Sequence, residues 1–336
     1  MNIVYGLTDA KKALLDLRNI EGSDQYESAK SAVESILNQV KSQGDTALRK
    51  LTIDFEGIDV AELEIPRAKL KDAYRKVSKE VLNSLRIAAD RIHRFHSASL
   101  PNNWMDRCEG YGEVFNPIER VGVYVPGGNA RFPSTVLMTV IPARVAGVPE
   151  VIMTTPSSDG NTPHPSVLVA ADIAGVDRIF QVGGAQAIAA MAFGTDTVPN
   201  VDLICGPGGL HTTIAKKSVY GNVGIDGLYG PTETVIIADE TANPTLCAAD
   251  LVAQAEHDPL ATPVLITTSN QLAESAQKEA NLRATMLPRS VIAMKSLHDR
   301  GIVAVVNNLD EAIGLSNDFA PEHLCLLVKN PSHHLE

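Results

Sequence analysis

The sequence predicts an α/β protein that has an N-terminal helical region followed by two parallel β-sheets, each covered by helices. Three observations predict it. Apolar residues recur at helical spacing between about residues 25 and 100, short apolar runs alternate with helical segments from Val121 onward, and this alternation occurs in two successive series. Such alternation is typical of βαβ units, in which helices cover both faces of a parallel sheet.

The N-terminal region contains several predicted helices separated by recognisable breaks. One apolar helix face is formed by Val33, Ile36, Leu37 and Val40. Gly44-Asp45 predicts the end of that helix and the start of another, and Ser78 is a predicted N-cap. The helix after Ser78 carries on one side Val81, Leu82, Leu85, Ala89, Ile92 and Phe95.

The two later series give the predicted sheets. The first has strands at 121–125, 151–154, 178–182 and 201–205 and helices at 134–146, 166–174 and 185–193, with Gly147 and Gly194 as helix ends. The second has strands at 234–238, 264–267, 302–306 and 324–328 and helices at 244–256, at 271–283 and from Asp310. The predicted division is 1–115, 116–232 and 233–336, with approximate bounds and with interleaving of the chain left open.

Composition restricts the class of protein. With 336 residues and 44% hydrophobic content, the chain can bury one large or two medium cores. A net charge of −11 and a pI near 5.3 argue against a nucleic-acid or anionic-membrane partner. The sequence has no signal-peptide pattern and no run near the roughly 20 apolar residues of a membrane span. The separated cysteines Cys108, Cys205, Cys247 and Cys325 fit a reducing cytoplasm, where we expect the protein.

Three glycine-rich turns follow predicted strands: 126–128, 183–184 and 206–209. In open α/β sheets ligands bind beyond the carboxyl ends of the strands, and glycine lets the backbone approach a phosphate there. Asp226 lies about 20 residues after Gly206, as a dinucleotide fingerprint requires, but the sixth position of that pattern is His211. Each turn alone is equally consistent with a tight turn that needs positive φ.

Two Glu-His pairs, Glu256-His257 and Glu322-His323, lie in segments that are candidates for metal binding or proton transfer. Gln254 and His257 share a face at a predicted helix end, and oxygen and nitrogen donors suit zinc, although two ligands do not complete a zinc site. Glu322 and His323 follow Pro321 at the mouth of an apolar strand and suit proton transfer. A helix-end histidine satisfied by its neighbours and a surface turn are the simpler alternatives.

Taken in order, these motifs resemble the histidinol dehydrogenase family. The resemblance covers nearly the whole chain and is carried by residues 121–128, 182–190, 206–208, 223–226, 230–233, 254–257 and 321–323. It implies a zinc-dependent, NAD-linked enzyme that oxidises L-histidinol through the aldehyde to L-histidine, the last steps of histidine biosynthesis. It also implies a homodimer of two incomplete Rossmann-like domains, similar to those of aldehyde dehydrogenases.

The resemblance also implies residue roles on the substrate side. Gln254 and His257 match zinc ligands and contact the substrate, and Thr232 stands where the family usually has a substrate-contacting serine. Glu322 and His323 match the catalytic pair. His323 would contact the substrate and take the alcohol proton, and Glu322 would activate the water that hydrates the aldehyde.

On the cofactor side, Tyr124 and Gln186 match NAD contacts, while Gly209 stands where the family has an asparagine that touches NAD. Tyr229 is bulky where a small residue is usual. The family also extends about 100 residues further, the size of a small domain, with an aspartate and a histidine ligand and a substrate-binding glutamate. We therefore expect this chain to be a fragment that binds zinc poorly and is nearly inactive.

Three other functions stay open. A relative acting on another polyol, such as a sulfopropanediol, would accommodate Gly209, Tyr229 and Thr232, although a sulfonate favours an arginine in the pocket. A non-catalytic dinucleotide-binding remnant is the second, but such a remnant need not keep both Glu-His pairs. An aldehyde dehydrogenase using Cys205 as nucleophile is the third, and the sequence places no evident base beside that cysteine.

Overall fold

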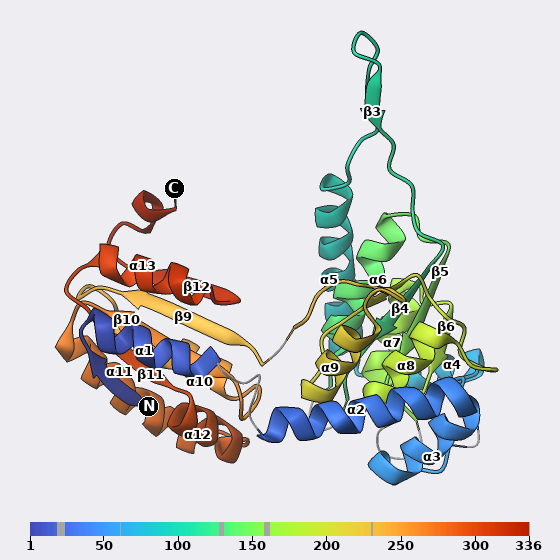
Figure 1. Cartoon of the computed structure of the whole chain (residues 1–336), viewed down its shortest axis with the longest axis horizontal. Helices are drawn as coiled ribbons and strands as arrows, with labels where there is room; N and C mark the ends of the chain where they lie inside the picture. Colours follow the sequence, from blue (N-terminus) through green and yellow to red (C-terminus); the bar gives the residue numbers. More distant parts are fainter. Residues whose placement is uncertain (19–23, 61, 128–130, 158–161, 230, 336) are drawn as a thin grey trace. The chain divides into compact units, whose positions relative to one another are not determined.

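The computed structural model describes residues 1–18, 24–60, 62–127, 131–157, 162–229 and 231–335. The chain divides into two compact units, Ser28–Gly230 and a second made of Met1–Glu27 with Pro231–Glu336. Each unit contains a five-stranded sheet in which all paired strands are parallel (Figure 1). We name them the β4 unit and the β9 unit after a central strand of each. The predicted fold class, two parallel sheets with covering helices, is confirmed.

In the helices that precede the β4 sheet, the predicted break at Gly44-Asp45 and the predicted helix start after Ser78 are confirmed. They are α2 (Asp24–Gln43), α3 (Asp45–Glu56), α4 (Arg67–Lys76) and α5 (Lys79–Ala98). The side chain of Ser78 accepts a hydrogen bond from the Val81 amide at 3.3 Å, which confirms it as the N-cap of α5. Helix α3 ends at Gly57, whose φ of 67° is the left-handed conformation that glycine adopts without strain.

The β4 sheet has the strand order β6-β5-β4-β7-β8. Its strands are β4 (Arg120–Tyr124), β5 (Glu150–Thr154), β6 (Arg178–Phe180), β7 (Leu203–Cys205) and β8 (Gly224–Ile225). The connecting helices are α6 (Pro133–Val145), α7 (Pro165–Ala174), α8 (Gly184–Phe193) and α9 (Leu210–Val219). Alternate residues of β4, such as Val121 and Val123, pack with α4–α7 in one core. The residues between these positions on the strand therefore point to the other face of the sheet.

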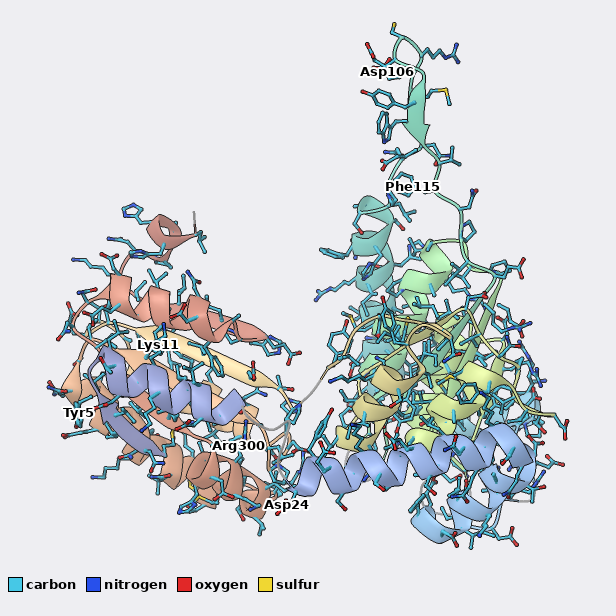
Figure 2. The ribbon with its side chains drawn as sticks, viewed as in Figure 1. Tyr5, Lys11, Asp24, Asp106, Phe115 and Arg300 are labelled. Atoms are coloured by element: carbon cyan, nitrogen blue, oxygen red, sulfur yellow. The ribbon has the colours of Figure 1, made fainter. Side chains whose placement is uncertain are left out.

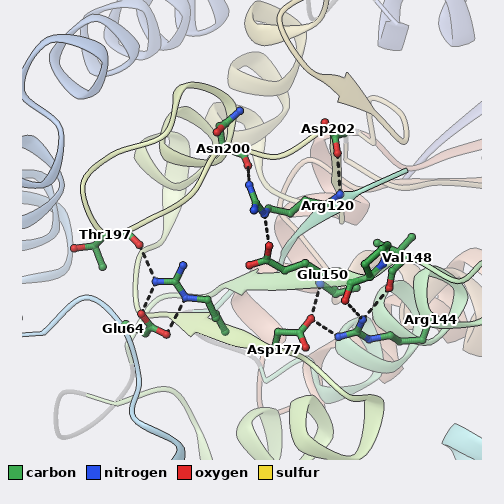
Figure 3. A network of polar contacts seen from close by, with 12 residues as sticks. Glu64, Arg120, Arg144, Val148, Glu150, Asp177, Thr197, Asn200 and Asp202 are labelled. Carbon is green, nitrogen blue, oxygen red and sulfur yellow. Dashed lines mark hydrogen bonds and ion pairs between the residues drawn. The ribbon is translucent and has the colours of Figure 1, made fainter. Parts of the chain in front are cut away.

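The amino edge of the β4 sheet is held by charged side chains (Figure 3). Arg120 donates to the Glu150 carboxylate at 2.6 Å and to the Asn200 carbonyl at 2.8 Å. Arg178 donates to Glu64 at 2.6 Å, and Arg144 contacts Asp177. These pairs join the starts of β4, β5 and β6 to neighbouring loops, so this edge is occupied by its own structural contacts.

An antiparallel hairpin projects from the β4 unit (Figures 1 and 2). It consists of β2 (Trp104–Asp106) and β3 (Tyr111–Glu113), and its side chains are mostly exposed. The Trp104 indole donates to Glu113 at 2.6 Å, and its ring meets Tyr111 edge to face at 5.9 Å. Neither strand of the hairpin had a predicted counterpart.

The β9 sheet has the order β1-β11-β10-β9-β12. Its strands are β1 (Asn2–Tyr5), β9 (Glu233–Ala238), β10 (Thr262–Thr267), β11 (Ile302–Val305) and β12 (His323–Leu327). Helices α1 (Leu7–Arg18) and α13 (Leu309–Phe319) cover one face, and α10 (Pro244–Ala255) and α11 (Asn270–Thr285) cover the other. Helix α12 (Ser290–Asp299) packs outside on α10 and α11, and a 3₁₀ turn, η1 (Pro331–His334), follows β12.

The N-terminal strand β1 had no predicted counterpart. It pairs with β11, with Asn2 opposite Ile302 and Tyr5 opposite Val305, so the start of the chain lies within the β9 unit. Within the residues that the structure describes, no helix has both the length and the apolar character that crossing a membrane requires.

Candidate active site

Both sheets contain a topological switch point. From β4 the chain continues through β5 to β6 on one side and then returns to place β7 on the other side. From β9 it continues through β10 to β11, and β12 then pairs on the other side of β9. Ligands of doubly wound sheets bind at the carboxyl ends of the two strands at such a point.

At the carboxyl edge of the β4 sheet lies a cavity of about 640 Å³. Its lining includes two of the predicted cofactor residues, Tyr124 and Gln186, together with Gly183, Gly184, Glu56 and His211. The structure therefore brings together the first two predicted cofactor residues, which come from β4 and from the first turn of α8. Gly128, the last residue of the first glycine turn, lies outside the described residues.

Tyr124 fixes the start of α8. Its side chain is buried, and its hydroxyl accepts a hydrogen bond from the Gly184 amide at 3.1 Å. Burial raises the pKa of the Tyr124 phenol, so the group is a neutral hydroxyl. Gly184 has a φ of 63°, and a Cβ there would lie 2.7 Å from the Gln186 side chain, so glycine is required for this approach.

The glycine turn after β7 is held by a buried ion pair that the sequence analysis missed. Lys216, on α9, is 2% exposed and donates to the Gly206 carbonyl at 2.9 Å while pairing with Asp226. Asp226 in turn accepts from the amides of Gly206 at 2.7 Å and Gly227 at 2.8 Å. Asp226, the acid at the position that a dinucleotide fingerprint requires, is thus already bound by other groups of the protein. No helix was predicted over these residues, and the apolar Ile214 and Ala215 directly before Lys216 were the signal for it.

The first turns of α8 and α9 both begin at a glycine N-cap without a capping side chain, Gly183 and Gly209. Their first amides have no partner within the helix, which favours an anion such as a phosphate. Gly209 is exposed with a φ of −69°, and a Cβ added to it would meet nothing within 4 Å. The position therefore has room for the asparagine that the resemblance implies.

Cys205 at the end of β7 lacks the character of a nucleophile. Burial, helped by the Asp226 carboxylate, raises the pKa of its thiol to about 12. The nucleophilic form of cysteine is the thiolate, which such a pKa suppresses at neutral pH. This geometry argues against a cysteine-dependent aldehyde dehydrogenase.

The remaining predicted residues gather at the amino edge of the β9 sheet. Helix α10 runs back from β9, so Gln254 returns to that edge, where its side chain accepts from the Thr234 hydroxyl at 2.7 Å. Thr234 is the register partner of His323 on β12, and the Thr232 carbonyl accepts from the Thr262 amide at 3.0 Å. One edge therefore brings together side chains from three segments that are distant in sequence.

Glu322 and His323 lie at the open end of this edge. The Glu322 Oε1 atom is 3.9 Å from His323 Nε2, and the side chains are 44% and 60% exposed. His257, one turn after Gln254, is also exposed, and its backbone carbonyl accepts from Arg289 at 3.3 Å. The three titratable groups are accessible to a small molecule from solvent.

Gln254 carries the observation that bears on a metal. One end of its buried amide is held by Thr234, while the Nε2 atom at the other end has no hydrogen-bond partner. A half-turn of the amide would let the nitrogen donate to Thr234 and would leave the oxygen unpaired, as a cation ligand requires. Gln254 and His257 thus fit two of the four donors that zinc takes. Across the described part of the chain, no group of three His, Cys, Asp or Glu side chains is placed to hold a metal.

Comparison with known proteins gives one consistent result. The family model described as histidinol dehydrogenase matches residues 20–336. A histidinol dehydrogenase of Thermosynechococcus vestitus is 45% identical over 336 residues, which are 98% of this chain and 78% of that protein. One from Dehalococcoides mccartyi is 47% identical over 306 residues, covering 90% of this chain and 70% of that protein.

Solved structures agree with the sequence comparison. The crystal structure of histidinol dehydrogenase from Elizabethkingia anophelis matches with a TM-score of 0.91 at 32% identity, covering 100% of this chain and 77% of that one. An aldehyde dehydrogenase from Bartonella henselae matches with a TM-score of 0.51 at 14% identity over 97% of this chain and 79% of its own. The second likeness concerns the fold alone.

Proposed function

Because this chain belongs to the histidinol dehydrogenase family, we propose that it serves the NAD-linked, zinc-dependent oxidation of L-histidinol through the aldehyde to L-histidine. The observation that carries the proposal is the amino edge of the β9 sheet, where Gln254, His257, Glu322 and His323 lie at one end of neighbouring elements. An alcohol oxidation needs a proton acceptor and a means of holding the substrate, and this edge offers both kinds of group.

The exposed pair Glu322 and His323 supplies the proton transfers. His323 Nε2 takes the proton of the alcohol as hydride leaves the carbinol carbon, because a neutral imidazole is a base near neutral pH. Glu322 deprotonates the water that adds to the aldehyde, which yields the hydrate needed for the second hydride transfer. Their separation of 3.9 Å lets each act on a substrate at the same edge without a direct bond between them.

Gln254 and His257 would provide two of the ligands of a zinc ion, with Thr234 orienting the amide. A bound zinc would hold and polarise the substrate. Because two donors are half of the usual shell, we expect weak zinc binding and slow turnover. Thr232, at the same edge, would contact the substrate. Tyr124, Gln186 and the Gly209 turn would hold NAD at the carboxyl edge of the β4 sheet.

The direct test measures NADH formation by the chain with NAD, excess zinc and either L-histidinol or histidinal. We expect slow formation that depends on histidinol and is lost in His257→Ala. Glu322→Gln should slow oxidation of histidinal more than the first oxidation of histidinol, because only the aldehyde must be hydrated. His298→Ala, which changes an exposed histidine at the end of α12, is the control. No histidinol-dependent NADH at saturating zinc would contradict the proposal.

One side chain favours a second substrate class. Arg289 contacts the His257 carbonyl, and its Nε atom is buried without a hydrogen-bond partner. An arginine in this position could bind an anionic group, as a sulfonated diol would require. The same assay with sulfopropanediol separates the two substrates. If NADH forms faster from the diol than from histidinol, and if Arg289→Ala slows that reaction, the diol is the substrate.

We also propose that the chain forms a homodimer, as the family resemblance implies. The β2–β3 hairpin supports the proposal because Trp104, Met105 and Tyr111 expose large apolar surfaces. Light scattering of the purified chain measures the mass directly.

A further inference from the structure

The cavity at the carboxyl edge of the β4 sheet contains an acid with no assigned role. Glu56 is the last residue of α3, and both oxygens of its carboxylate are buried without a hydrogen-bond partner. The amides of Gly183 and Ser157 lie close enough to favour its charged form, but burial outweighs them and raises the pKa of the Glu56 carboxyl. The negative end of the α3 dipole also disfavours a carboxylate there. A carboxyl group buried at such an unfavourable position suggests that it binds a ligand.

The position of Glu56 indicates which part of a ligand it would meet. It faces Pro156, Ser157 and Gly183, since a Cβ on Gly183 would lie 2.7 Å from Pro156 and 2.9 Å from a Glu56 oxygen. Pro156 and Ser157 come directly after Thr155 at the end of β5, the second strand of this sheet in chain order. In dinucleotide-binding sheets an acid at the end of the second strand accepts the ribose 2′-hydroxyl of NAD.

No competing acid takes that place among the described residues. Asp226, which the glycine pattern had suggested, is bound by Lys216 and by the Gly206 and Gly227 amides. The described residues that line the cavity include His211 but no lysine or arginine to bind a 2′-phosphate. The two uncapped helix starts at Gly183 and Gly209 offer amides to the linking phosphates instead.

We propose that Glu56 accepts hydrogen bonds from the ribose hydroxyls of the adenosine half of the cofactor and thereby selects NAD over NADP. The inference rests on the proposed NAD-linked function and adds to it the residue that discriminates between the two cofactors. A carboxylate facing the 2′ position gains a charged hydrogen bond from a hydroxyl and repels a phosphate.

The test is calorimetric binding of NAD, NADP and NAD lacking the adenosine 2′-hydroxyl to the full chain and to Glu56→Gln. Loss of a hydrogen bond to a charged group should weaken NAD binding by roughly 10- to 100-fold. NADP binding should stay the same or tighten. Removing the 2′-hydroxyl should weaken binding to the wild type and change little in Glu56→Gln. Asp54→Asn, an exposed acid on the same helix, is the matched control.

A purely structural role predicts the opposite pattern. If Glu56 only caps the start of α8, Glu56→Gln lowers the melting temperature and leaves the NAD and NADP affinities unchanged, which overturns the inference. If the wild type binds NAD but the 2′-deoxy analogue binds equally well, the inference fails while the proposed function stands. If the wild type binds neither dinucleotide, the proposed NAD-linked function itself fails.

Discussion

At the scale of single residues, Gly209 stands where the family resemblance implies an asparagine. The turn that starts α9 lacks both a capping side chain and any neighbour within 4 Å of an added Cβ. Asparagine is a strong N-cap, and its amide would also reach a ligand at the helix start. The backbone at this helix start is therefore regular and has room for the side chain that the resemblance implies.

We predict that Gly209→Asn tightens NAD binding by roughly 2- to 10-fold, the effect of one neutral hydrogen bond. Calorimetry measures it. Gly209→Ala is the control, because it fills the same space without an amide and should leave the affinity unchanged. Equal affinities in all three proteins would mean that this position does not face the cofactor.

The buried Glu56 carboxyl also predicts how the folding stability depends on pH. Its pKa is raised in the folded protein, so the folded state holds the proton more tightly than the unfolded chain does. The resulting destabilisation is absent below about pH 4.5, the ordinary value for glutamate, and is fully present above the raised pKa. Glu56→Gln should therefore be more stable than the wild type at pH 7, and urea unfolding should show the difference shrinking toward pH 4.5. Tyr124 and the Gly183 and Ser157 amides, which face Glu56, are unchanged in this comparison.

A stability difference of the opposite sign would contradict that interpretation. If Glu56→Gln were less stable at pH 7, and the deficit grew with pH, the amides would dominate over burial. Glu56 would then be a cap rather than a ligand-binding acid.

At the scale of elements, the turn after β7 depends on α9 through one buried lysine. Lys216→Met would leave Asp226 with a charge that no cation compensates, and breaking a buried pair in this way costs about 3–5 kcal/mol. Because Asp226 is 21% exposed, we expect the lower end of that range in denaturant unfolding. Lys217→Met, at the adjacent exposed position, should change stability by less than about 0.5 kcal/mol.

The helices and central strands were predictable because periodicity and capping act locally. Gly44-Asp45 and Ser78 mark helix boundaries in the sequence and in the structure alike. Strand β1 was not predictable in this way, because its four residues gain their place only by pairing with β11, about 300 residues later. Lys216 and Glu56 were missed for a similar reason, since their roles depend on burial by distant segments.

At the scale of the whole molecule, the two sheets carry their candidate binding and chemical groups at opposite edges. The β4 sheet closes its amino edge with arginine–carboxylate pairs (Figure 3). A cavity opens at its carboxyl edge. The β9 sheet carries the candidate chemistry at its amino edge, and at its carboxyl edge Asp239 binds the Thr241 and Lys329 amides. The sequence alone placed the motifs in order along the chain, but strand direction and register were needed to group them by edge.

We therefore assign dinucleotide binding to the switch point of the β4 sheet. Amide hydrogen exchange of the full chain with and without NAD tests that assignment most directly. We predict that NAD slows exchange at the starts of α8 and α9, from Gly183 to Gln186 and from Gly208 to His211, because the cofactor covers these amides and its phosphates pair with those that lack a partner. The carboxyl edge of the β9 sheet, from Asp239 to Thr241, should be unchanged. Protection at Asp239–Thr241 with none at Gly183 or Gly209 would contradict the account.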